Sequence, residues 1–187
     1  MKSFLLFALL GLGLAFQSCA QRAVYVNGQA LNQQTIQALE YQYQVRIQPG
    51  RYWYDPTNGW WGFEGGAVAG IMMPGLRLGG PLNAQASRGR TGVFINGRQI
   101  NRTELSQLQQ LVGAQIGAGR YWVDSYGNAG PQGGYATVNL YQAYQAAMNS
   151  YGGGNSAFSK SYNTGAGYGS NGSDFYIMGE DFSYSNF

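Results

Sequence analysis

Apolar and polar residues alternate around an Asn-Gly pair at two places in the chain. These places are residues 24–31, which read VYVNGQAL, and residues 93–100, which read VFINGRQI. Asn-Gly between alternating apolar residues favours a tight hairpin, because a type I′ turn requires positive φ at both of its central residues. Each segment is therefore predicted to form a short antiparallel hairpin.

Directly after each hairpin, apolar residues recur at the spacing of an α-helix. Asn32 in the first segment and Asn101 in the second stand at the N-cap position. Thr35 and Glu104 follow three residues later, where a capping box places its second residue. The sequence therefore predicts two capped helices. Their apolar stripes are Ile36, Leu39 and Tyr43 in the first and Leu105, Leu108 and Val112 in the second.

Short apolar and aromatic runs, separated by Gly and Asp turns, follow each helix. In the first copy they lie at 45–48, 51–54 and 60–63, and the turn between the last two reads DPTNG. Asp at the first position of such a turn bonds to the backbone, and Gly adopts the left-handed conformation. The pattern predicts one ββ-α-βββ unit in each half of the chain.

The two halves are copies of one sequence. Residues 24–55 align without a gap with residues 93–124, and 11 of these 32 positions are identical, which indicates an internal duplication. The identical pairs are Val24/Val93, Asn27/Asn96, Gly28/Gly97, Asn32/Asn101, Leu39/Leu108, Ile47/Ile116, Gly50/Gly119, Arg51/Arg120, Tyr52/Tyr121, Trp53/Trp122 and Asp55/Asp124. After a one-residue deletion the alignment resumes, so that Trp60, Trp61 and Glu64 face Asn128, Ala129 and Gln132.

The duplication predicts the fold class and the division of the chain. Each copy is near the size below which a domain needs disulfides or metals to fold alone. We therefore expect an α+β fold, mainly antiparallel, in which two tandem repeats pack as one pseudo-symmetric domain. The expected parts are an export signal at 1–20, repeat 1 at 21–73, a connection at 74–92, repeat 2 with a terminal helix at 93–150, and a Gly/Tyr-rich tail at 151–187. Within this plan, residues 67–73 predict a buried strand, 139–150 a helix, and 175–178 with 182–184 a terminal hairpin.

The first 20 residues have the layout of an export signal. Lys2 precedes the apolar run FLLFALLGLGLAF, which is too short to span a bilayer stably. Cleavage after Ala20 is one interpretation. Lipidation of Cys19, the single cysteine, is the other. Both predict an exported protein that is periplasmic, anchored in the outer membrane or extracellular.

Composition limits the chemistry. Asp, Glu, Lys and Arg make up 10% of the residues and histidine is absent, so a Ser-His-Asp triad is excluded and metal or haem sites are disfavoured. The formal net charge of +3 is small for a nucleic-acid-binding protein, and no cofactor is expected. Hydrolysis of glycans by a pair of carboxylates remains possible. The candidates are Asp55, Glu64, Glu104 and Asp124.

The aromatic residues near the repeated Arg-Tyr-Trp-x-Asp motif are the candidate binding residues. On a strand, alternate side chains share a face, so Arg51, Trp53 and Asp55 are expected to point one way. The group could bind a sugar, or the tryptophan could pack under its arginine while the aspartate caps the turn. Recurrence in both copies favours the structural role. The candidate ligand-binding residues are Arg51, Trp53, Trp60, Trp61, Arg120 and Trp122. Trp60 and Trp61 are preferred because one copy alone has them, so the fold needs them less and we expect them to be exposed.

The motifs GRYWYD, PGLRLGGPL and TGVFINGR, followed by GRYWVD, resemble a recurring pattern in uncharacterised exported bacterial proteins. The resemblance covers residues 24–140 and implies export and duplication, with no activity attached. The first hypothesis is a non-catalytic binding or structural module of a bacterial envelope, with a polysaccharide or another envelope protein as partner. The alternatives are a carboxylate-based glycan hydrolase and a self-assembling module of the cell surface.

Overall fold

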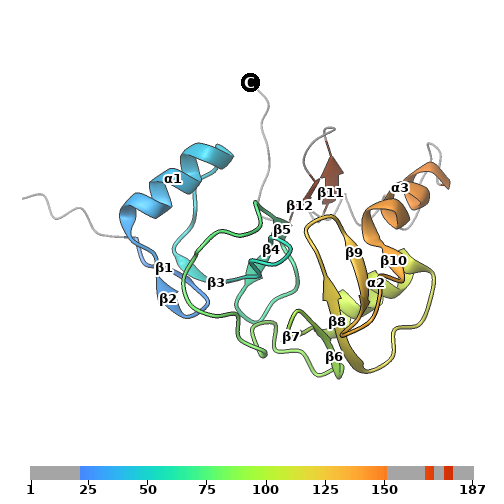
Figure 1. The fold of residues 1–187 in the computed structure, drawn as a ribbon. Coiled ribbons are helices and arrows are strands. Elements are labelled where there is room, and N and C mark those ends of the chain that lie inside the picture. Colours follow the sequence, from blue (N-terminus) through green and yellow to red (C-terminus); the bar gives the residue numbers. More distant parts are fainter. Residues whose placement is uncertain (1–21, 151–166, 171–174, 179–187) are drawn as a thin grey trace, which may run out of the picture.

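The computed structural model describes residues 22–150 and the two strands Gly167–Ser170 and Phe175–Met178. It confirms an α+β fold built from two similar units, each with one five-stranded sheet. Figure 1 shows the first unit in blue and green and the second in yellow and orange, side by side.

Repeat 1 has the element order ββ-α-βββ. Its elements are β1 (Val24–Val26), β2 (Gln29–Ala30), α1 (Gln33–Tyr43), β3 (Gly50–Tyr54), β4 (Trp60–Phe63) and β5 (Gly70–Ile71). The strand order in sheet A is β2-β1-β3-β4-β5, and β1 runs parallel to β3 while the other pairs are antiparallel.

Repeat 2 follows the same plan and adds a helix. Its elements are β6 (Val93–Ile95), β7 (Arg98–Gln99), α2 (Arg102–Val112), β8 (Gly119–Val123), β9 (Asn128–Pro131), β10 (Val138–Asn139) and α3 (Leu140–Ser150). Its sheet B has the order β10-β9-β8-β6-β7, with β6 parallel to β8. The third helix, expected from the sequence, packs beside α2 and against β9 and β10.

The local signals operate as the sequence predicts. Asn27 and Asn96 have φ of 48° and 49°, as the hairpin turns require. The Asn32 side chain accepts a hydrogen bond from the Thr35 amide at the start of α1. At α2, Asn101 and Glu104 form the complete capping box.

The sequence did not indicate the parallel pairing in each unit, which is held by an asparagine side chain. The Asn27 side chain accepts from the Tyr54 amide at 3.0 Å and donates to the Tyr54 carbonyl at 2.8 Å. Asn96 makes the same two bonds to Val123, at 3.0 and 2.8 Å. The repeated asparagine therefore shapes the turn and also connects the hairpin to the strand beyond the helix.

The predicted strand at 45–48 is wrong. Helix α1 ends at Tyr43, its C-cap residue Gln44 has φ of 52°, and the chain then turns toward Arg22. The Ile47 amide donates to the Glu40 carboxylate at 2.8 Å, and Arg22 donates to the Ile47 carbonyl at 3.3 Å. Because side chains already bond these backbone groups, they cannot form the inter-strand hydrogen bonds of a sheet. The third strand after the helix is β5, which lies inside the apolar run at 67–73.

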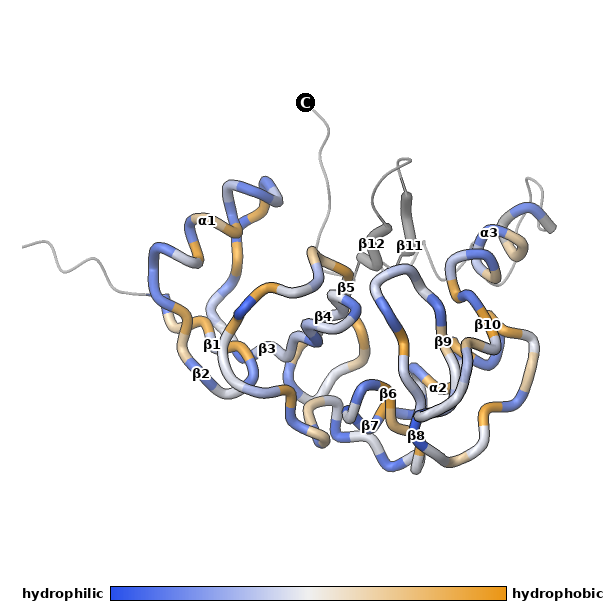
Figure 2. Tube along the Cα trace, viewed as in Figure 1, coloured by the Kyte–Doolittle hydropathy of each residue, from blue (hydrophilic) through white to orange (hydrophobic). Residues whose placement is uncertain are grey.

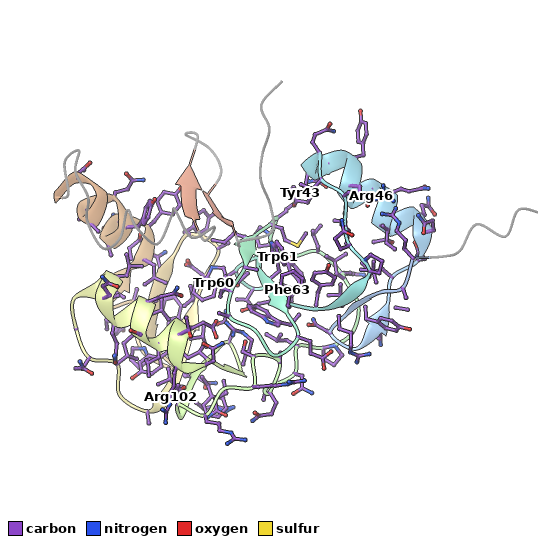
Figure 3. The ribbon with its side chains drawn as sticks, turned by 180° about the vertical axis from the view of Figure 1, so that it is seen from behind. Tyr43, Arg46, Trp60, Trp61, Phe63 and Arg102 are labelled. Atoms are coloured by element: carbon purple, nitrogen blue, oxygen red, sulfur yellow. The ribbon has the colours of Figure 1, made fainter. Side chains whose placement is uncertain are left out.

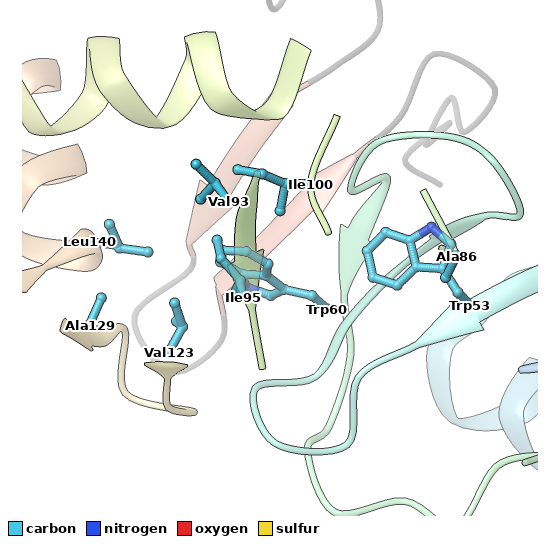
Figure 4. Packing of buried hydrophobic residues seen from close by; sticks show 9 residues of the cluster. All are labelled: Trp53, Trp60, Ala86, Val93, Ile95, Ile100, Val123, Ala129 and Leu140. Carbon is cyan, nitrogen blue, oxygen red and sulfur yellow. The ribbon is translucent and has the colours of Figure 1, made fainter. Parts of the chain in front are cut away.

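Buried side chains form two clusters, one of which joins the repeats. The first lies between α1 and sheet A and includes Ile36, Leu39 and Tyr54. The second contains Trp53 and Trp60 of repeat 1 together with residues of repeat 2 and the connection (Figure 4). Hydrophobic and hydrophilic positions alternate along α1 in Figure 2, as a helix covering one face of a sheet requires.

The last described strands form a two-stranded antiparallel sheet. β11 (Gly167–Ser170) pairs with β12 (Phe175–Met178), and β12 lies against β5. The sequence predicted a different partner for 175–178, namely 182–184, which lies outside the described residues. The proposed export signal and Cys19 also lie outside them.

Candidate functional site

The two arginines of the repeated motif have equivalent surroundings. The guanidinium of Arg51 lies 5.2 Å from the centre of the Tyr25 ring, and that of Arg120 lies 5.1 Å from the Phe94 ring. Arg51 also donates to Glu64 at 2.5 Å. These exposed arginines cover the aromatic residue on the parallel neighbouring strand, so neither covers the tryptophan of its own motif.

The two tryptophans of the motif differ in burial. Trp53 is 1% exposed, whereas Trp122 is partly exposed. Each indole donates to a glycine carbonyl, Gly66 at 3.3 Å and Gly134 at 3.2 Å. Trp53 is therefore a packing residue of the junction between the repeats.

Arg98 covers Trp53, and the sequence reasoning missed it. Its guanidinium lies 3.9 Å from the indole centre, it is 1% exposed, and its Nη1 lies 2.8 Å from Oε1 of Glu104 and donates to Oε2 at 3.0 Å. It also donates to the hydroxyl of Ser87 in the connection. The internal alignment contained a signal for this ion pair, because Arg98 and Glu104 are two opposite charges at positions where repeat 1 has the uncharged Gln29 and Thr35.

Asp55 completes the polar part of the junction. One carboxylate oxygen accepts from the Thr57 amide at 2.9 Å and the other from the Asn96 side chain at 2.7 Å. Burial raises the pKa of Asp55, and the Asn96 and Thr57 bonds and the charge of Arg98 oppose that rise. Burial lowers the pKa of Arg98, whereas the nearby negative charges of Glu104 and Asp55 raise it. Since arginine titrates so far above neutrality, it stays charged.

Trp60 and Trp61 point to opposite faces of β4. Trp60 is 8% exposed and belongs to the cluster at the junction, so the expectation that it is exposed is wrong. Trp61 is partly exposed on the other face, 6.2 Å from Tyr52 and 6.3 Å from Phe63 between ring centres. Tyr52 and Phe63 are 5.1 Å apart. We call Tyr52, Trp61 and Phe63 the aromatic face; two of its members are labelled in Figure 3.

The aromatic face reaches solvent, and two of its three members occur in one repeat alone. Phe63 is 40% exposed, and Met73, whose carbonyl accepts from the Tyr54 hydroxyl, is 52% exposed. In repeat 2 the positions of Trp61 and Phe63 hold Ala129 and Pro131. Tyr52 has a counterpart in Tyr121, and Trp61 packs partly under α1, but Phe63 is not required to build the unit, so its exposed ring is available for another purpose.

Each of the candidate carboxylates has a structural partner. Asp124 accepts from the Tyr126 and Asn128 amides, and Glu64 pairs with Arg51. In the described part of the chain, no three His, Cys, Asp or Glu side chains lie close enough together to hold a metal ion. The described helices include none with the length and apolar character to cross a bilayer.

The chain is similar to part of two proteins of Arabidopsis thaliana. Extra-large guanine nucleotide-binding protein 1 is 42% identical over 113 residues, which are 59% of this chain and 13% of that protein. Extra-large guanine nucleotide-binding protein 2 is 34% identical over 115 residues, which are 60% of this chain and 13% of that protein. The chain therefore corresponds to a small part of these relatives. No family model matches it, and no solved structure matches it.

These relatives correct the functional expectations. The resemblance to exported bacterial proteins is wrong, and so are the export signal and the exported location (periplasmic, outer-membrane-anchored or extracellular). The lipoprotein character and the polysaccharide or envelope partners are wrong as well. The glycan hydrolase and the cell-surface assembly are contradicted on the same ground. The error has a physical reason. A short apolar run followed by a cysteine is a sparse pattern, whereas the similarity to the relative extends over 113 residues, more than half of the chain.

Proposed function

We propose that the chain is a non-catalytic protein-interaction module that binds an amphipathic helix of a signalling protein through the aromatic face of repeat 1. The observation that carries the proposal is the exposure of Phe63 beside Trp61, at a position where repeat 2 has a proline. Met73, which follows β5 in the same repeat, is also exposed. Exposed aromatic and methionine side chains are enriched where proteins bind one another.

The relatives support a signalling partner more than a nucleotide site in this chain. By their names they bind guanine nucleotides, yet the chain has no G-x-x-x-x-G-K-[ST] sequence. Its only lysines are Lys2 and Lys160, and neither follows a glycine. A phosphate loop needs that lysine and its glycines. The matched part therefore accompanies the nucleotide-binding part of such proteins, a position suited to binding a regulator or target.

Repeat 2 supports a helix as the bound element. There α3 covers the same side of its sheet, beside α2 and against β9 and β10, and buries Leu140 and Tyr144 one turn apart. In repeat 1, α1 is the one described helix over this side of sheet A. A partner helix with two apolar residues four positions apart would cover the aromatic face as α3 covers sheet B.

The test compares the full chain with Phe63→Ser and Met73→Ser. Proteins retained by each from an extract of the source organism are identified by mass spectrometry, and the affinity of each purified candidate is measured by calorimetry. The matched control is Tyr126→Ser, because Tyr126 is 78% exposed in repeat 2. We expect at least a tenfold loss of affinity with both variants and none with the control.

Two results would contradict the proposal. One is an identified partner that binds both variants and the wild-type chain with equal affinity. The other is saturable binding of a fluorescent GTP analogue by the chain itself, since that would make it a nucleotide-binding domain.

A further inference from the structure

Repeat 2 contains an apolar cavity of about 360 Å³ between α2, α3 and sheet B. Its walls come from β6, β8, β9, β10, both helices and the loop after α2, and none of the residues that line it is charged. Figure 4 shows Val93, Val123, Ala129 and Leu140 directed toward one space. The volume falls in the range of small-molecule sites, at its lower end.

The cavity exists because three aromatic side chains of repeat 1 have smaller counterparts in repeat 2. Tyr43, Tyr54 and Trp61 pack in the core under α1. The aligned positions hold Val112, Val123 and Ala129, and all three line the cavity. The strand register supports the alignment, since Tyr54 pairs with Trp61 across β3 and β4, and Val123 pairs with Ala129 across β8 and β9.

The remaining positions around this space are aliphatic in both repeats. Leu108 and Ile116 line the cavity, and the equivalent Leu39 and Ile47 pack around the aromatic side chains in repeat 1. The same aliphatic frame therefore surrounds phenol and indole rings in one repeat and open space in the other. A space with this frame suits a flat ring and offers no counter-charge to an ion.

We propose that the cavity of repeat 2 binds one small, neutral aromatic molecule, an indole or a phenol. The ring would occupy the volume that Trp61 and Tyr54 fill in repeat 1. Gln115 and Thr137, which also line the cavity, offer polar side chains to its N–H or O–H group. A ring that enters this cavity gains dispersion contacts with its aliphatic lining, which the open space lacks.

The probes are the side-chain analogues 3-methylindole and 4-methylphenol, titrated into the full chain by calorimetry. We expect saturable binding of at least one of them, with one site per chain. Ala129→Trp places an indole in the cavity and is expected to weaken probe binding at least tenfold. Val112→Tyr, which restores the side chain of repeat 1, is the second filling variant.

The matched control is Ala136→Trp, the same substitution at an exposed position that does not line the cavity. It should bind the probe as the wild type does, and circular dichroism establishes that each variant is folded. The proposal is overturned if neither probe binds, or if binding survives in a folded Ala129→Trp or Val112→Tyr chain. Binding of a tryptophan-containing peptide without binding of free 3-methylindole would also overturn it, in favour of a protein side chain as the occupant.

Discussion

Arg98→Met tests the junction between the repeats most directly. The substitution keeps a long side chain beside the Trp53 indole and removes the charge that compensates Glu104. Both members of the pair are almost fully buried, at 1% and 3% side-chain exposure. Removal of one partner of such a pair costs about 3–5 kcal/mol, because the other charge is left buried without compensation.

Two further losses belong to the same substitution. The guanidinium stacked 3.9 Å from the Trp53 centre contributes about 2 kcal/mol when desolvated, part of which methionine recovers by contact with the ring. The hydroxyl of Ser87, which is 1% exposed, loses its bond from Arg98. We therefore expect a total loss of about 4–6 kcal/mol, a large share of the roughly 5–15 kcal/mol available to a domain.

The assay is urea unfolding at neutral pH of four chains: wild type, Arg98→Met, Glu104→Gln and the double variant. Glutamine can still complete the capping box with Asn101, so Glu104→Gln removes the charge and leaves the helix start in place. We expect the double variant to lose about 2–3 kcal/mol less than the sum of the single variants, as directly interacting groups do.

Arg102→Met is the matched control, because Arg102 is exposed at the start of α2 and its replacement should change the free energy by no more than about 0.5 kcal/mol. Equal losses for Arg98→Met and Arg102→Met would refute the reasoning. Strict additivity in the cycle would show that Arg98 acts by volume alone, without coupling to Glu104.

Two further predictions concern the backbone and pH. Gly79→Ala should destabilise the chain by at least about 2 kcal/mol more than Gly75→Ala in the same urea assay, since both glycines have positive φ but a Cβ on Gly79 would lie 1.8 Å from the Val26 carbonyl oxygen, while none lies within 4 Å at Gly75. Equal losses would contradict that packing. Because burial raises the pKa of Asp55, the folded chain binds more protons than the unfolded one between the two pKa values. The wild type should therefore gain stability relative to Asp55→Asn as pH falls through the folded pKa, and a relative loss on acidification would mean that the pKa is lowered instead.

Local signals in the sequence predicted the elements well, because short-range bonds determine them. The Asn-Gly turns and the caps at Asn32 and Asn101 lie within a few residues of the groups they bond. The predicted strand at 45–48 failed because its backbone bonds go to Glu40 and Arg22. Nothing in a run of apolar residues reveals such competition from side chains elsewhere in the chain.

The candidate site was harder to predict because it depends on which face of β4 meets the second repeat. The sequence identified Trp60 and Trp61 as a pair, and the pleat of the strand separates them. It also connected Arg51 with Trp53, although the side chain that covers Trp53 is Arg98. Side-chain partners from different copies lie far apart in the sequence, and the internal alignment compares the copies without showing where they touch.

Comparison of the two copies separates the residues that build the unit from those that distinguish its halves. Asn27 and Asn96 make the same bonds, and each motif arginine covers the same neighbour, so identical positions maintain one local structure. Where the copies differ in size or charge, the structures differ in role. Trp60 packs at the junction, while Asn128 in its place donates to Asp124 of its own repeat at 2.9 Å.

The different partners of the two motif aspartates make the two repeats non-equivalent. In repeat 1 the aspartate of the motif receives its second bond from Asn96 across the junction, and in repeat 2 the equivalent aspartate is satisfied within its own unit. The motif aspartate therefore bonds across the junction in repeat 1 and within its own unit in repeat 2. A chain with the order of its repeats reversed would leave Trp60 without Ile95 and Ile100 to pack against, and Arg98 without its indole. Duplication thus supplied two copies of one unit, and divergence at a few positions made the copies unequal and no longer interchangeable.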